Sequence, residues 1–196
     1  MVEHQLANFF PINEEENTIL REYISPILKK CYHCYQNIDN KYMQRGVFSP
    51  FHSGQWLIFL YYYSNAVSAI SPNLADKIYY LNKIMNGIDV YHEVKLPDVF
   101  YFEHPLCSIF GRANYGNHFI AMQGCTVGGN RDRSTGAIMY PTLGNHVTML
   151  SNSKIIGKSK IGNNVVIAAN TYVKDIEIPD NATVFGISPN ITIKFL

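Results

Sequence analysis

A repeat of six residues in the C-terminal part of the chain constrains the fold more than any other feature. An aliphatic side chain or methionine recurs at every sixth position from 143 to 173, and a small or β-branched residue stands four positions after each of the first five. The first class is Leu143, Met149, Ile155, Ile161, Ile167 and Val173, and the second is Val147, Ser153, Ser159, Val165 and Thr171. Helices repeat every 3.6 residues and strands every 2, so neither explains a period of six. The repeat predicts a parallel β-helix, in which each hexad forms a short strand and a corner and three hexads complete one turn.

Polar residues between the hexad positions are expected at the corners of this coil. Gly and Asn tolerate positive φ better than other residues do. Corners are therefore predicted at Gly144-Asn145, Gly157 and Gly162-Asn163-Asn164. His118 and His146 each follow an asparagine at equivalent positions, and we expect both to be exposed turn residues.

One interruption of the repeat predicts a loop. The same phase continues upstream through Tyr115, Ala121 and Val127, but 16 residues separate Val127 from Leu143, which is not a multiple of six. The segment 128–142 begins with two glycines and is charged and polar, so we expect it to leave the coil. Loops on rigid solenoids commonly carry binding residues.

The N-terminal part of the chain has a helical period instead. Apolar residues at three- and four-residue spacings predict helices over 14–35, 54–70 and 74–85, separated by Ser71-Pro72 and ended by Gly87. The stripe formed by Trp56, Phe59, Leu60 and Tyr63 is predicted to be a packing face. We therefore expect a helical region over 1–86 and a β-helix domain over 87–196.

Composition argues against several classes of protein. With 16 basic and 15 acidic residues, the formal net charge is +1, which does not favour a nucleic-acid binder. The longest apolar stretch, 56–63, is too short to cross a bilayer, and the N-terminus lacks the pattern of a secretory signal, so a cytoplasmic location is expected. Cys31 and Cys34 have a metal-like spacing, but no second pair follows, so no metal is expected.

Three motifs together resemble one family. Residues 103–111 read Glu-His-Pro-Leu-Cys-Ser-Ile-Phe-Gly, residues 87–90 read Gly-Ile-Asp-Val, and residues 123–129 read Gln-Gly-Cys-Thr-Val-Gly-Gly. With the hexads, they are similar to the hexapeptide-repeat acyltransferases, in particular the serine acetyltransferase-like branch. The resemblance implies a left-handed β-helix, a homotrimer that can pair into a dimer of trimers through the helical region, and acetyl-CoA bound between neighbouring prisms as co-substrate.

The resemblance also implies roles for single residues. His104 matches the family's catalytic histidine, and Asp89, fifteen residues upstream, matches its partner aspartate. Glu103 matches an acid that meets the acceptor amine. The cofactor-binding positions are Gly128, Gly129, Ser151 and Ala169, and Lys154, Lys158, Lys160 and Lys174 are candidates for the CoA phosphates. The chemistry fits, because an imidazole oriented by a carboxylate can take the proton of a hydroxyl that attacks a thioester.

One departure bears on the acceptor. Where serine acetyltransferases have Arg-His-Pro after the loop, this chain has Met139-Tyr140-Pro141, so the pair that helps to hold the serine carboxylate is missing. We expect Tyr140 to lie at the acceptor instead. The departure favours O-acetylation of a small or sugar hydroxyl, for example in surface-polysaccharide assembly. L-serine O-acetylation, with Arg131 or Arg133 supplying the cation, is the alternative. N-acetylation of an amino sugar and a non-catalytic scaffold remain open.

Overall fold

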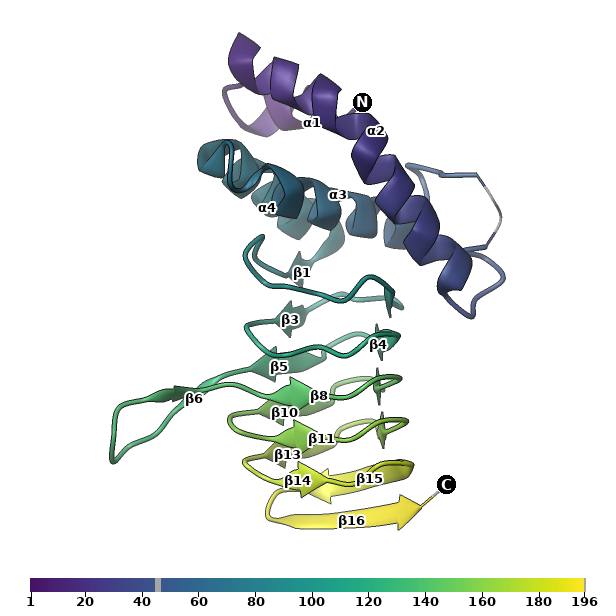
Figure 1. Ribbon diagram of the computed structural model, residues 1–196, viewed down its shortest axis with the longest axis vertical. Coiled ribbons are helices and arrows are strands. Elements are labelled where there is room, and N and C mark those ends of the chain that lie inside the picture. Colours follow the sequence, from purple (N-terminus) through teal and green to yellow (C-terminus); the bar gives the residue numbers. More distant parts are fainter. Residues whose placement is uncertain (45–46, 196) are drawn as a thin grey trace. The chain divides into compact units, whose positions relative to one another are not determined.

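The computed structural model describes residues 1–44 and 47–195, which form two compact units, Met1–Glu93 and Val94–Leu196 (Figure 1). The division falls seven residues after the predicted end of the helical region. The reason is that residues following the last helix fold back on it, where Tyr91 and His92 both reach Asp76.

The first unit is a group of helices. They are α1 (Val2–Phe9), α2 (Glu14–Asn37), α3 (Ser53–Val67) and α4 (Pro72–Asn86). The three predicted helices are present, whereas α1 was not expected from the sequence. A capping box between Asn13 and Glu16 starts α2, and α3 is buried on nearly all sides because both α2 and α4 pack against it. The Trp56 and Phe59 rings stack at 5.0 Å, which confirms the predicted packing stripe.

The second unit is a parallel β-solenoid of about six turns with three faces (Figure 1). The first face contains β2 (Phe100–Phe102), β4 (Phe119–Ala121), β9 (Thr148–Met149), β12 (Val166–Ile167) and β15 (Ala182–Ile187). The second contains β3 (Ser108–Phe110), β5 (Thr126–Gly128), β10 (Lys154–Ile156) and β13 (Tyr172–Lys174). The third contains β8 (Thr142–Leu143), β11 (Lys160–Ile161) and β14 (Glu177–Ile178). An antiparallel strand, β16 (Asn190–Phe195), pairs with β15 at the C-terminal end of the coil.

The strand register confirms the period of six. Ile155 pairs with Val173, eighteen positions later, so one turn holds three hexads. Ile155 also pairs with Val127, twenty-eight positions earlier, because that turn contains ten additional residues. All eleven residues of the two predicted inward classes are buried. The small second class fits because the coil interior is narrow at those positions.

The corners are built differently from the prediction in one respect. Gly157 and Asn164 have positive φ as expected, but Gly144 and Gly162 do not. They are required for space instead, because a Cβ atom on Gly144 would lie 2.7 Å from the carbonyl oxygen of Gly162 in the next turn. His118 and His146 both have positive φ, and their rings stack at 4.4 Å, which confirms them as corner residues. His146 is exposed as predicted, whereas His118 is half-buried.

A ladder of side-chain amides supports this corner. The backbone N–H of Asn117 donates to the side chain of Asn145, and that of Asn145 donates to the side chain of Asn163, both at 2.8 Å. The backbone N–H of Asn163 donates to Asp180 at 2.7 Å. Each turn therefore satisfies a backbone donor of the turn before it.

Candidate active site

His104 lies at a corner of the coil, two residues after β2. The backbone N–H of Glu103 donates to the carbonyl of Ala121 at 2.9 Å, and that of Leu106 donates to the carbonyl of His104 at 2.7 Å. His104 has φ 50, an uncommon value for a residue with a Cβ atom. Its side chain is exposed, and within the described part of the chain its ring has no hydrogen-bond partner. The backbone is thus fixed while the imidazole is presented to solvent.

The corner between the first and second faces continues below His104, and we call it the His104 edge. Backbone N–H groups connect its successive turns: Gly124 donates to Leu106, Asn152 to Gln123, and Asn170 to Ser151, at 2.8 to 2.9 Å. Ser151 lies two turns below His104 and Ala169 lies three turns below. At a spacing of about 4.8 Å between neighbouring strands, three turns span roughly 14 Å.

The His104 edge therefore groups three of the predicted residues. Ala169 is exposed and Ser151 is half-buried, so neither position is closed off from solvent. Lys154 also belongs here, because its ammonium donates to the carbonyl of Asn152 at 3.0 Å. Lys158 lies in the corner after β10, and Lys160 begins β11 of the third face.

Gly128, Gly129 and Tyr140 lie together at a different corner, between the second and third faces. A Cβ atom on Gly129 would lie 2.9 Å from the Tyr140 ring, so the fold itself requires this glycine. A Cβ atom on Gly128 would meet only Ile156, at 3.8 Å, which is an ordinary contact. Within residues 1–44 and 47–195, no close contact of such a Cβ atom explains why position 128 is a glycine.

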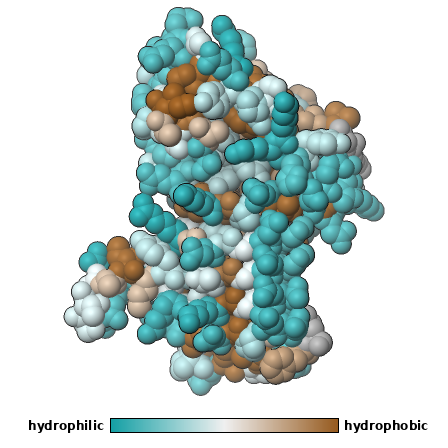
Figure 2. Space-filling view, viewed as in Figure 1, coloured by the Kyte–Doolittle hydropathy of each residue, from teal (hydrophilic) through white to brown (hydrophobic). Residues whose placement is uncertain are grey.

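The predicted loop is an ordered arm. Its strands β6 (Asn130–Arg131) and β7 (Ile138–Met139) form an antiparallel hairpin that projects from the coil (Figure 1). Asp132 accepts hydrogen bonds from the backbone and hydroxyl of Ser134, which hold its pKa at about 2. Figure 2 shows the arm standing away from the coil with both apolar and hydrophilic surface, and Ile138 is half-exposed.

The two arginines of the arm differ in their environment. The Arg131 guanidinium donates to the carbonyl of Gly136 at 3.2 Å and so helps to close the hairpin. Arg133 is exposed near the tip. Met139 and Tyr140 lie at the base of the arm, at the positions where serine acetyltransferases have Arg and His. Arg131 and Arg133 lie further out along the arm.

Asp89 follows α4, in β1 (Ile88–Asp89) of the first unit. Its Oδ1 accepts from the Tyr79 hydroxyl at 2.8 Å, and its Oδ2 accepts from the Lys83 ammonium at 2.6 Å. Burial alone raises the pKa of this carboxyl, but the bonds from Lys83 and Tyr79 outweigh burial and lower it. Sequence reasoning missed both partners, although their spacing of four on one helix, just before a helix-ending glycine, was a usable signal.

Glu103 is half-buried beside His104 in the sequence. Burial raises the pKa of the nearby Tyr101, and the negative charge of Glu103 raises it further. Glu103 is therefore close enough to Tyr101 to place a negative charge on this side of the coil.

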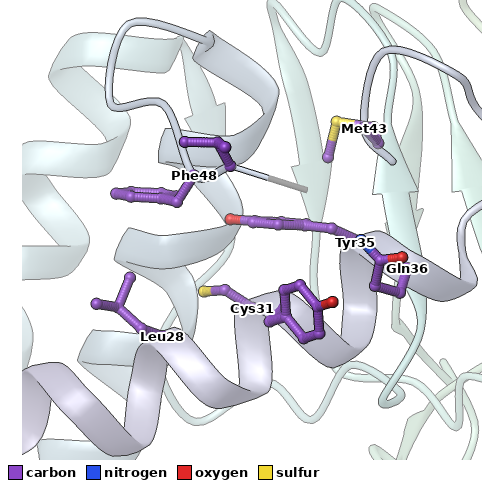
Figure 3. A pocket seen from close by; sticks show the side chains of 8 residues that line it. Leu28, Cys31, Tyr35, Gln36, Met43 and Phe48 are labelled. Atoms are coloured by element: carbon purple, nitrogen blue, oxygen red, sulfur yellow. The ribbon is translucent and has the colours of Figure 1, made fainter. Parts of the chain in front are cut away.

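An apolar cavity of about 210 Å³ lies in the helical unit, among Leu28, Cys31, Tyr35 and Phe48 (Figure 3). Burial raises the pKa of the Cys31 thiol to about 12, so this cysteine is not a nucleophile. The Tyr35 hydroxyl donates to the carbonyl of Gln55 at 2.7 Å. Across residues 1–44 and 47–195, no three His, Cys, Asp or Glu side chains converge as a metal site. No helix in these ranges is long and apolar enough to span a membrane.

Comparison with known proteins identifies what the chain resembles. No family model matches it. It is 28% identical over 117 residues to the serine acetyltransferase of Synechococcus elongatus, covering 59% of this chain and 47% of that protein. The chain spans about half the length of the curated relatives it matches.

Solved structures match more of the chain. Neisseria gonorrhoeae serine acetyltransferase aligns with a TM-score of 0.72 at 21% identity, over 91% of this chain and 71% of that one. A serine acetyltransferase in complex with CoA aligns with a TM-score of 0.68 at 18% identity, over 90% of this chain and 74% of that one.

The fold is that of the hexapeptide-repeat acyltransferases, with the left-handed β-helix and N-terminal helices that were predicted. In sequence and in fold the chain resembles serine acetyltransferases.

Proposed function

We propose that this protein transfers the acetyl group of acetyl-CoA to a hydroxyl, and that the acceptor is L-serine. The observation that carries the proposal is His104, an exposed imidazole at the family's catalytic position, on the same edge of the coil as Ser151 and Ala169. The similarity to serine acetyltransferases favours serine over the sugar acceptor that the missing Arg-His pair predicts.

His104 is the general base in this proposal. It takes the proton from the acceptor hydroxyl as the oxygen attacks the thioester carbon, and it returns that proton to the departing CoA sulfur. A positioned general base contributes about 10² to 10⁴ in rate. By the resemblance to serine acetyltransferases, Asp89 matches the aspartate that orients such an imidazole and stabilises its protonated form during attack.

The CoA groove is proposed to form between two copies of the chain. The His104 edge supplies the imidazole, Ser151 and Ala169. Gly128 and Gly129 come from the corner between the second and third faces, where the arm begins, and we call it the arm corner. It is a different edge of the same prism. A homotrimer places the arm corner of one copy beside the His104 edge of the next, so both sets can face one substrate.

Serine binding then needs a cation from the arm. Arg133 is the better candidate, because Arg131 already donates to Gly136. Charge-assisted hydrogen bonds to a carboxylate are worth about 1.5 to 3 kcal/mol, or roughly 10- to 100-fold in affinity. Glu103 is proposed to bind the serine amine.

The test is thiol release from acetyl-CoA by the purified protein, with L-serine, neutral sugars and amino sugars as acceptors. We expect saturable release with L-serine and none with sugars. Arg133→Gln should raise KM for serine about 10-fold or more, whereas Arg131→Gln should change it less. Thiol release with a sugar and none with serine would contradict serine as the acceptor and support O-acetylation of a sugar hydroxyl. Absence of CoA binding by calorimetry would leave a scaffold.

A further inference from the structure

Two imidazole rings are stacked on the edge of the coil between the third and first faces. The rings of His118 and His146 are nearly parallel, with 5° between their planes and 4.4 Å between their centroids. Both residues belong to the second unit. The N–H of His118 donates to the carbonyl of Val99 and that of His146 to the carbonyl of Asn117, at 2.8 to 2.9 Å. The backbone therefore holds the two rings in register.

The stacked pair joins the two ends of the turn that carries the arm. His146 lies one turn below His118, because Ile120 pairs with Thr148, twenty-eight positions later. The next turn, from His146 to Asn164, takes eighteen positions, so the additional residues of the arm lie between the two histidines. The stack is thus a side-chain contact between the start and the end of the arm-bearing turn.

The backbone at these positions does not itself require histidine. His118 and His146 have φ 59 and 56, and the equivalent corner residues of the two turns below, Asn164 and Asn181, have φ 54 and 55. Asparagine tolerates this conformation at least as well as histidine does. The two imidazoles therefore add something that an amide at the same corner would not, and that is a group that titrates near neutral pH.

Protonation of both rings would place two like charges against each other. At 4.4 Å, two unit charges oppose each other by about 0.7 pH unit even in bulk water. Burial lowers the pKa of His118, and the charge of His146 lowers it further. Within residues 1–44 and 47–195, neither ring forms an ion pair that could offset the second charge.

The other charged groups along this edge lie further away. Asp98 lies in the turn above His118, and Asp180 lies two turns below His146, where it accepts from the backbone N–H of Asn163 at 2.7 Å. The side chains between these acids and the rings are neutral amides, which themselves accept hydrogen bonds from backbone N–H groups. Burial and His146 are accordingly the causes that lower the pKa of His118.

We propose that His118 and His146 form a pH-sensitive latch, which holds the two ends of the arm-bearing turn together while at most one ring is protonated and releases them in mild acid. The inference does not depend on the reaction that the protein catalyses. Folded His118 takes up its proton at a lower pH than an unfolded histidine, whose pKa is about 6.5. The unfolded chain therefore binds more protons in this window, so the stability of the coil falls as pH drops below about 6.5 and is unaffected above it.

The first test is an NMR titration of the His118 imidazole in the full-length protein. His146→Asn, which suits the positive φ, should raise the His118 midpoint by about half a pH unit or more. His146→Phe keeps a ring against His118 without its charge and should also raise the midpoint. The matched control is Asn164→Gly, at the same corner one turn lower, which should leave the midpoint unchanged. An unchanged midpoint in folded His146→Asn or His146→Phe overturns the inference.

The second test is hydrogen exchange, measured by mass spectrometry on peptides from residues 116–148 at pH 7 and pH 5. Comparing the unsubstituted protein with His146→Asn at each pH cancels the intrinsic pH dependence of exchange. The ratio of the two exchange rates, unsubstituted over His146→Asn, should be higher at pH 5 than at pH 7, because only the unsubstituted protein has a pair to release. An equal ratio at both pH values would show that the pair titrates without releasing the turn, and the latch would be wrong.

Discussion

Replacing Ile155 by alanine should destabilise the coil by about 3 to 4 kcal/mol. Ile155 is fully buried and stacks on Val127 in the turn before it and Val173 in the turn after it, both also fully buried. The change removes three carbon atoms, worth about 2.4 kcal/mol at 0.8 per methylene. A further cost of about 1 kcal/mol follows because neighbours anchored in their own turns cannot close the cavity.

Ile156→Ala is the matched control, because Ile156 lies next in the chain and points out of the coil. It is partly exposed, so its truncation should cost less than about 1 kcal/mol. Urea unfolding followed by circular dichroism, at one fixed protein concentration, measures both free energies of unfolding. If Ile156→Ala costs as much as Ile155→Ala, the assignment of inward positions in the hexad is wrong.

Three further changes test single sites. His104→Gly should leave the protein about 1 kcal/mol more stable than His104→Ala in thermal unfolding, because φ 50 crowds a Cβ atom and glycine has none. The folded pKa of Asp132 is about 2, below its usual 3.8, so the stability that this carboxylate contributes is complete above pH 4 and is lost as pH falls toward 2; NMR of the arm amides measures this. Gly129→Ala should lower the melting temperature by displacing the Tyr140 ring, whereas Gly128→Ala should fold normally and raise KM for acetyl-CoA.

The sequence predicts the coil well because a narrow prism accepts few side chains. Each inward position repeats the same constraint, so Leu143 to Val173 show a pattern that needs no long-range information. The corner glycines show the limit of this reasoning. Gly144 and Gly162 were assigned to positive φ, but they are small because the next turn lies against them. Contacts between turns are invisible in a linear pattern.

The sequence predicts which residues belong to the candidate site, but it does not predict how they are arranged in space. The motifs point to His104 and Asp89, but the cofactor positions fall on two corners of the coil, which only the strand register reveals. Tyr79 and Lys83 were missed because they lie in a helix that otherwise has a packing pattern. Their hydrogen bonds to the Asp89 carboxylate depend on the left-handed turn at Gly87, which brings Asp89 back beside the end of α4.

The measurement that tests the account most directly compares two corner histidines of the same coil. His104 and His118 both have positive φ, but His118 stacks on His146. With L-serine and acetyl-CoA, His104→Ala should lower kcat/KM by about 10² to 10⁴, while His118→Ala should stay within about twofold of the unsubstituted protein. Full activity in folded His104→Ala, or an equal loss in His118→Ala, would contradict His104 as the base.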